Sequence, residues 1–331
     1  MATRTDQRAQ WADIELEVNA YTDNDPSVFK GKTILLPCGD DESSNFTKFF
    51  ATRIRHYGID KIIATDYAQD GNQGKALVIN SNMVDADGDI NLDDFEWKYL
   101  DGDGDFRSEE VTELRDEADI VITFPPASLL AEFIQWAIDG GVQFLVLGTM
   151  NTSTCREVFP FFKSGKVWCG STVNSSGMKL FVPESIEHGN AGNNGGNGVN
   201  NFITAQQMRW FTNIEHYGRG EELRMMSMSD NQRFNKKIVN NEHSYARYDN
   251  CDAIEVPAVE GIPSDYKGAM GVPIAFLDRH NTAQFEIIGH SSELAEPINI
   301  DGKDRIGRLY INGASKHDRI IIKNKKPDYS V

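Results

Sequence analysis

Short apolar runs alternate with amphipathic segments through the first half of the chain. Residues 33–37 and 61–65 are runs of mainly apolar side chains that predict short buried strands. Between them, residues 44–57 place large apolar side chains at helical spacing. The first elements are therefore expected in the order strand, helix, strand.

The same order recurs further along the chain. Residues 120–123 and 143–147 are apolar enough for buried strands, and residues 128–138 between them have the pattern of a helix that Gly140 and Gly141 close. Buried strands that alternate with helices are typical of a parallel sheet covered on both faces. The pattern predicts an α/β fold with a doubly wound, mostly parallel, Rossmann-like sheet.

The second half of the chain is less regular. Gly189–Asn201 is rich in Gly and Asn and predicts a flexible loop, because it has little apolar surface to bury. Strands are expected at 207–213 and at 319–326, the latter with a basic end. We expect residues 1–150 to form a binding and catalytic core, and residues 151–331 to complete it and add a recognition region.

Composition narrows the class of protein. The chain has 331 residues and a net charge of −17, which argues against a nucleic-acid partner. The argument is weak, because a local basic groove is sufficient for binding. The four cysteines form no CxxC pair, so neither a zinc site nor a disulfide framework is indicated. Apolar runs are shorter than the roughly 18 residues of a membrane span, and a cytoplasmic protein with no membrane partner is expected.

Ligands of doubly wound sheets bind at the carboxyl ends of the strands, so the loops there are candidate sites. The first loop contains Cys38, Gly39 and Asp40 and lacks the GxGxxG dinucleotide fingerprint. Asp66 follows the second strand, where a carboxylate can bind both hydroxyls of a ribose. A plain turn at the first loop and a capping role for Asp66 are the structural alternatives.

Two acidic clusters occupy residues 85–89 and 101–105. A calcium loop of the EF-hand type needs Gly at its sixth position, where this chain has Ile90 and Phe106, so no metal site is expected. Asp105 and Phe106 instead suit a purine, because the carboxylate can accept from an exocyclic amine while the ring packs on the base. Solvated turn carboxylates are the alternative.

The segment Thr123-Phe124-Pro125-Pro126-Ala127 runs from a buried strand into two prolines. Prolines donate no N–H and hold a fixed extended path, so their carbonyl groups are available to a substrate amine. The structural alternative is a rigid strand-to-helix turn in which Ser128 caps the following helix.

With these pieces in order, nearly the whole chain resembles the EcoRI-type DNA adenine-N6 methyltransferase family, which has a class I fold and uses S-adenosyl-L-methionine. The matching segments are Asp13-Ile-Glu-Leu-Glu17, Asp40-Asp41, Ser44-Asn45-Phe46, Lys48-Phe49-Phe50, Gly102-Asp-Gly-Asp-Phe-Arg-Ser108, Asp119-Ile-Val-Ile-Thr123, Glu157-Val-Phe159, Tyr248-Asp-Asn250, Asp252-Ala-Ile254, Met270-Gly-Val-Pro-Ile274 and Phe276-Leu277.

The resemblance implies the roles of several residues. The cofactor would be bound by Cys38, Gly39, Asp40, Asp66, Asp105, Phe106 and Thr123. The substrate would be double-stranded DNA, with the target base flipped into a catalytic pocket formed by Phe124, Pro125, Pro126 and Ala127. Residues from about 150 onward would recognise DNA, and candidate phosphate contacts are Lys163, Lys166, Arg209, Arg233, Lys236 and Lys237.

Two segments depart from the family pattern. The family has Asn-Pro-Pro-Phe where this chain has Phe-Pro-Pro-Ala, and Asp-Glu-Phe-Tyr-Thr-Gln where it has residues 5–10, Thr-Asp-Gln-Arg-Ala-Gln. Three hypotheses follow: an adenine methyltransferase with an altered target pocket, an enzyme that methylates another base or atom such as cytosine or a modified base, and a catalytically silent DNA-binding protein.

Overall fold

The computed structural model describes residues 9–37, 44–68, 72–84, 97–173, 178–181, 202–205 and 207–328. The loop expected at Gly189–Asn201 lies outside the described residues. The chain divides into two compact units, of which unit 1 comprises residues 1–152 and 169–217, and unit 2 comprises residues 153–168 and 218–331.

Unit 1 is built on a sheet that, within the described residues, has eight strands in the order β4-β3-β2-β1-β5-β6-β10-β7. The four central strands are parallel, while β3, β4 and β10 run antiparallel to their neighbours. The predicted doubly wound, mostly parallel sheet is therefore confirmed. The strands are β1 (Thr33–Leu36), β2 (Lys61–Asp66), β3 (Lys75–Asn80), β4 (Lys98–Tyr99), β5 (Ile120–Thr123), β6 (Gln143–Thr149), β7 (Trp168–Cys169) and β10 (Met208–Thr212).

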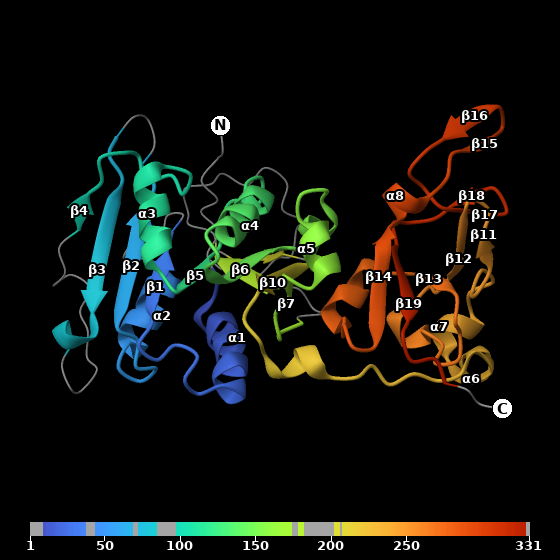
Figure 1. Cartoon of the computed structure of the whole chain (residues 1–331), viewed down its shortest axis with the longest axis horizontal. Helices are drawn as coiled ribbons and strands as arrows, with labels where there is room; N and C mark the ends of the chain where they lie inside the picture. The colour runs from blue at the N-terminus through green and yellow to red at the C-terminus, as the bar shows by residue number, and fades with distance from the viewer. Residues whose placement is uncertain are drawn as a thin grey trace, which may run out of the picture. The chain divides into compact units, whose positions relative to one another are not determined.

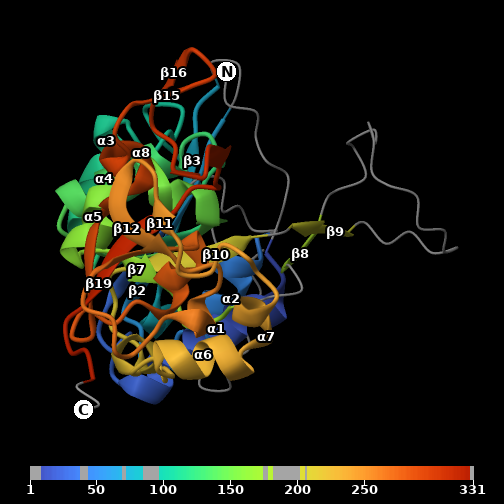
Figure 2. The same ribbon diagram turned by 90° about the vertical axis from the view of Figure 1, so that its right-hand side faces the viewer.

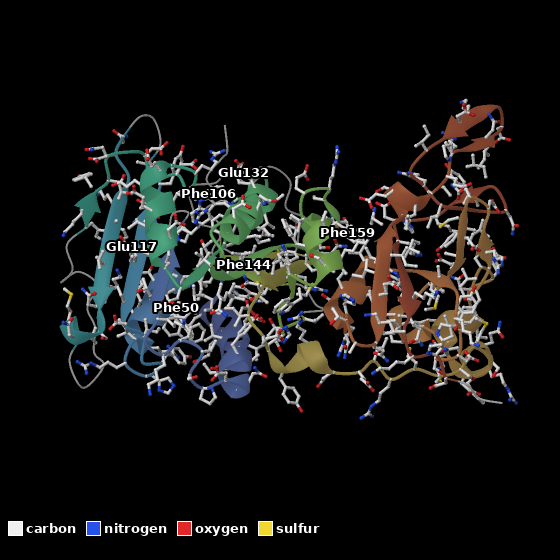
Figure 3. The ribbon with its side chains drawn as sticks, in the orientation of Figure 1. Phe50, Phe106, Glu117, Glu132, Phe144 and Phe159 are labelled. Atoms are coloured by element: carbon white, nitrogen blue, oxygen red, sulfur yellow. The ribbon has the colours of Figure 1, made fainter. Side chains whose placement is uncertain are left out.

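Helices cover both faces of this sheet, as Figure 1 shows with α3 and α4 above it and α1 and α2 below it. Their bounds are α1 (Trp11–Asn24), α2 (Asn45–Arg53), α3 (Glu109–Glu117) and α4 (Leu130–Asp139). Strand residues alternate between the two layers, so both faces bury apolar side chains. Figure 3 labels Phe50 of α2 below the sheet, and Phe106 above it.

The helix after the two prolines begins later than the sequence predicts. Residues 127–129 form a turn in which the Leu129 N–H donates to the Pro126 carbonyl at 2.8 Å, and α4 starts at Leu130. Ser128 is exposed, and no side chain caps this helix, so the Ser128 cap of the structural alternative is wrong. Backbone hydrogen bonding of the turn replaces it. Gly141 ends the helix with a positive φ of 65°, as its sequence predicts.

Two further strands of unit 1, β8 (Met178–Phe181) and β9 (Phe202–Ala205), pair as an antiparallel hairpin. Short 3-10 helices, η1 (Ser81–Met83) and η3 (Met150–Thr154), follow β3 and β6. The expected strand at 207–213 is confirmed as β10.

Unit 2 contains a second sheet, with five strands in the order β11-β12-β13-β19-β14 in the described part of the chain. Its final strand, β19 (Ile320–Asn324), confirms the strand expected near the C-terminus and lies between β13 (Ala269–Val272) and β14 (Phe285–His290). The remaining elements are α5 (Phe159–Ser164), η4 (Tyr217–Gly220), α6 (Met228–Phe234), α7 (Lys236–Val239), β11 (Arg247–Tyr248), β12 (Cys251–Glu255), η5 (Val259–Gly261), η6 (Ile274–Arg279) and α8 (Ser291–Leu294), with the hairpins β15 (Ile298–Ile300) and β16 (Lys303–Arg305), and β17 (Tyr310–Ile311) and β18 (Ala314–Ser315).

In the part of the chain that the structure describes, no helix has the length and apolar character needed to cross a bilayer.

Candidate active site

The carboxyl ends of the parallel strands of unit 1 bring the predicted loops together. The hydroxyl of Thr123, at the end of β5, is buried and donates to the carbonyl of Pro37, just after β1, at 2.5 Å. The Pro-Pro loop therefore starts beside the loop after β1. Cys38, Gly39 and Asp40, the cofactor residues predicted in that loop, lie outside the described residues.

The second acidic segment, residues 101–106, packs against the end of β2. The Ala68 N–H donates to the Asp103 carbonyl at 2.8 Å. Gly104 has a φ of +81°, and a Cβ atom there would lie 2.5 Å from the Asp66 carbonyl oxygen. This close approach needs glycine for both reasons. The fold thus unites Asp66 with the loop that carries Asp105, two sites that the sequence places 39 positions apart.

Side chains on two helices hold the same loop in place. Glu110 of α3 accepts hydrogen bonds from the backbone N–H groups of Asp101 and Gly102 at 3.0 and 3.3 Å. Phe106 is 3% exposed and packs edge-to-face against Phe133 of α4, with ring centroids 5.0 Å apart. Figure 3 labels Phe106 and Glu132 on the α4 side of the sheet. The Phe106 ring anchors the loop to α4.

The Asp105 carboxylate is ionised and already hydrogen bonded. It accepts from the backbone N–H and the guanidinium of Arg107, with Nη2 at 2.6 Å from Oδ2. Hydrogen bonds from the Arg107 side chain are the main cause that holds the pKa of Asp105 below its usual value. At neutral pH the group is therefore an acceptor only, and its remaining lone pairs suit an amine or hydroxyl.

The Pro-Pro loop, residues 124–127, has backbone carbonyl groups but no polar side chain, and Pro125 is buried. Phe124 is partly buried against the core between the sheet and α1 and α2, and Ala127 is exposed. The Pro126 carbonyl is used by Leu129, whereas no donor from the described part of the chain reaches the Pro125 carbonyl.

The segment before α1 reaches the same edge of the sheet. Asn45, the first residue of α2, donates from Nδ2 to the Ala9 carbonyl at 2.7 Å. Because α2 follows the loop after β1, this bond brings the divergent N-terminal segment next to that loop. Residues 5–8 of the segment lie outside the described residues.

The predicted phosphate contacts are spread over both units. Arg209 belongs to β10 of unit 1, and the others lie on or near α5, α6 and α7 of unit 2. Some already have partners: the Lys163 ammonium donates to the Ile288 carbonyl at 2.6 Å, and Lys237 pairs with Glu260 at 3.0 Å.

Two residues of the site were not predicted. Arg107 has a local signal, because a side chain two positions after Asp105 can fold back onto it. Glu110 has none, since its contact with residues 101 and 102 depends on where α3 packs. As for metals, no three His, Cys, Asp or Glu side chains converge in the described ranges, which omit the acidic cluster at 85–89.

Comparison with known proteins identifies relatives over almost the full length. A family model described as "Adenine-specific methyltransferase EcoRI" matches residues 3–326. Type II methyltransferase M.EcoRI of Escherichia coli is 34% identical over 324 residues, which cover 96% of this chain and 92% of that protein. Type II methyltransferase M.MpnI of Mycoplasma pneumoniae is 34% identical over 289 residues, which cover 83% and 79% of the two chains.

A third relative, type II methyltransferase M.MgeORF184P of Mycoplasma genitalium, is 31% identical over 330 residues, which cover 95% of this chain and 93% of that protein. No solved structure is significantly similar to the chain.

Proposed function

Because the chain belongs to the EcoRI family of adenine-specific methyltransferases, we propose that it methylates a base flipped out of double-stranded DNA, with S-adenosyl-L-methionine as the methyl donor. By membership of the family the target is adenine N6, in a pocket altered at Phe124 and Ala127. The DNA substrate makes the cytoplasm of a bacterial or phage-infected cell the expected location.

One observation carries the proposal: the loops after β1, β2 and β5 meet at one edge of the sheet. The bond from Thr123 to Pro37 joins two of them, and the approach of Gly104 to Asp66 adds the acidic loop. Sheets of this kind bind ligands at this edge. Polar acceptors on adjacent loops suit a ligand with hydroxyl and amine groups.

The acceptors present fit an adenosyl group. We assign Asp66 to the ribose hydroxyls and Asp105 to the adenine amine, with the loop at residues 38–40 beside the methionine part. The pKa of Asp105 lies below its usual value, so the carboxylate remains an acceptor at neutral pH. When bound, the cofactor supplies an electrophilic methyl group.

The Pro-Pro loop orients the nucleophile. The carbonyl of Pro125 accepts one hydrogen of the target amine, which directs the nitrogen lone pair toward the methyl group. Asn at position 124 would accept the second hydrogen, and Phe124 has no such acceptor. The loss of a preorganised polar partner at a reacting centre costs on the order of 10²–10³ in rate. Ala127 provides no ring on which a base can stack, a contact worth about 1–3 kcal/mol.

Two alternative functions are also compatible with the changed loop. A pocket without the second acceptor suits a base or atom that needs no such help, such as a cytosine amine or a modified base. A silent DNA-binding protein is favoured by the same loss together with the divergent N-terminal segment. We assign much of the DNA recognition to the part of the chain beyond residue 150, where five of the six basic candidates belong to unit 2: Lys163, Lys166, Arg233, Lys236 and Lys237.

The deciding experiment uses an isotopically labelled methyl donor. The protein is incubated with the donor and DNA, the DNA is digested, and the labelled nucleosides are identified by mass spectrometry. Labelled N6-methyladenine is the expected product. A different labelled nucleoside would support methylation of another base or atom. DNA binding without any labelled nucleoside would show that the protein is a catalytically silent DNA-binding protein.

A further inference from the structure

Charge is divided unequally between the two units. Unit 1 holds 14 Lys and Arg against 32 Asp and Glu, whereas unit 2 holds 19 against 18. Within unit 2, residues 303–326 contain eight basic and two acidic residues. The large negative charge of the chain therefore belongs to unit 1, and one segment of unit 2 has the charge that a polyanion requires.

Part of this segment lies on a projecting hairpin. Strands β15 and β16 pair antiparallel, with Ile300 opposite Lys303, and stand out from the rest of unit 2 (Figures 1 and 2). The two-residue turn is Asp301-Gly302, with φ of 52° and 73°, as in the tight hairpin turns that favour Asp-Gly. Asn299 also donates to Asp304 across the strands at 2.7 Å. The hairpin has a defined shape.

The hairpin and the residues after it present cations without partners. Lys303, Arg305 and Arg308 are exposed, and none forms an ion pair or a side-chain hydrogen bond with a described residue. By contrast, Arg319 in the same basic segment is buried against Glu255. Unpaired guanidinium groups can bind phosphate oxygens through two N–H donors at once.

A groove of about 550 Å³ separates this hairpin from β17 and β18. Arg305 and Arg308 line it together with Tyr310 and Ser315, and Asp301 and Asp304 also contribute. Two carboxylates therefore balance the two guanidinium groups in the lining. An anionic ligand is indicated because these guanidinium groups form no ion pair with a described residue.

An apolar side chain lies between the two arginines. Ile306 is 76% exposed, although an isoleucine usually occupies a core. Proteins that bind the minor groove of DNA often place an apolar side chain next to cations, where it contacts sugars or base steps. The exposure of Ile306 and its basic neighbours therefore point to the same ligand.

We propose that residues 303–308 form a DNA contact in which Arg305 and Arg308 bind backbone phosphates and Ile306 packs into the DNA groove between these phosphates. This contact rests on the proposed function, because it presupposes duplex DNA as the substrate. It adds a DNA-binding segment to the basic residues near α5, α6 and α7.

The test measures the salt dependence of DNA binding by fluorescence anisotropy with a labelled duplex, using the full chain. The logarithm of the affinity falls as the logarithm of the salt concentration rises, and each lost phosphate contact makes this slope shallower by about 0.9. Arg305→Ala with Arg308→Ala should make the slope shallower by about two, and the double variant with Lys at both positions should keep the wild-type slope. Ile306→Ala should weaken binding and leave the slope unchanged.

A matched control is Lys30→Ala with Lys98→Ala, which removes two exposed cations from unit 1; it should bind DNA like the wild type. Wild-type affinity and slope in the double Arg-to-Ala variant would overturn the hairpin contact alone. If the wild-type chain bound no DNA, the hairpin contact and the proposed function would both fall. If the wild-type chain bound DNA without transferring a methyl group, the proposed catalysis would be wrong. The salt slopes of the variants would still decide whether the hairpin contacts DNA.

Discussion

In the proposed function, Phe124 occupies the position that decides how the target amine is held. Its ring is partly buried against the core between the sheet and α1 and α2, and it offers no hydrogen-bond acceptor. No described donor reaches the neighbouring carbonyl of Pro125, so in the proposed function this carbonyl accepts one of the two amine hydrogens. The proposed chemistry of the loop therefore depends on two side chains, at positions 124 and 127, more than on the path of its backbone.

The double variant Phe124→Asn with Ala127→Phe restores the family's loop. We expect adenine methylation to rise by on the order of 10²–10³, because an acceptor for the second amine hydrogen returns together with a stacking surface. The measurement is the rate of N6-methyladenine formation, with Ala127→Phe alone to isolate the stacking contribution. Unchanged methylation by a folded double variant that still binds cofactor would contradict our account of the loop.

The acidic loop at 101–106 shows how a glycine can control a site. Gly104 combines a positive φ with a close approach to the Asp66 carbonyl. Gly104→Ala should displace the loop and lower cofactor affinity at least tenfold, because about 1–2 kcal/mol of backbone strain is added to the steric clash. Isothermal titration calorimetry checks this. The control is Gly102→Ala, whose Cβ would meet no atom within 4 Å, and an equal loss there would refute the argument.

Helix α1 is fixed to the rest of unit 1 by a buried carboxylate. Glu17 is fully buried and accepts hydrogen bonds from the Tyr21 hydroxyl, from the backbone N–H groups of Ser171 and Thr172, and from the Thr172 hydroxyl, at 2.5–2.9 Å. A Cβ at Gly170 would lie 2.2 Å from one carboxylate oxygen. The carboxylate thus links the N-terminal helix to the loop after β7.

Glu17→Gln should destabilise unit 1 by about 3 kcal/mol, because the new NH₂ group cannot accept and leaves buried donors without a partner. Thermal unfolding monitored by circular dichroism checks this. Glu15→Gln on the same helix is the control, since Glu15 forms a partly exposed pair with Arg53, and such pairs contribute about 0–1 kcal/mol. Equal effects of the two substitutions would contradict the role of Glu17.

At the scale of elements, the sequence was sufficient to predict a strand or helix where its buried positions follow a simple pattern. The central parallel strands are apolar on both faces, so their residues, such as those of β5, predict them without tertiary information. In unit 2 the strand β19 was predicted but its place in the sheet could not be, because β13 and β19 pair across about 50 residues and carry no local signal of each other. The start of α4 was misplaced because Pro126 and Leu129 form a backbone turn that dispenses with the Ser128 cap.

For the molecule as a whole, we assign two different tasks to the two units. Each unit has its own apolar core, and all of the excess negative charge belongs to the unit that we assign to the cofactor. A DNA backbone is repelled by such a surface, so the roughly neutral unit 2 with its basic segment is the better place for phosphate contacts. This division could be inferred only once the two units had been assigned, since the total charge conceals it.

Unit 2 depends on a buried ion pair that tests this separation. Arg319 donates to Glu255 from two nitrogens, at 2.6 and 3.2 Å, and the two side chains are 11% and 4% exposed. Tyr248 donates to the same carboxylate. Arg319→Met would leave a buried carboxylate without its cation, which destabilises a fold by about 3–5 kcal/mol. We therefore expect unit 2 to lose protection in β13 and β19 while unit 1 remains folded.

Hydrogen exchange measured by mass spectrometry, together with cofactor and DNA binding, checks the Arg319→Met variant. Cofactor affinity should stay within about twofold of the wild type, because unit 1 has its own core, and DNA affinity should fall. The control is Arg247→Met, which removes an exposed pair with Asp252 from the same sheet and should change neither. If cofactor binding and DNA binding failed together, the two units would share one cooperative fold, and the separation of tasks between them would be wrong.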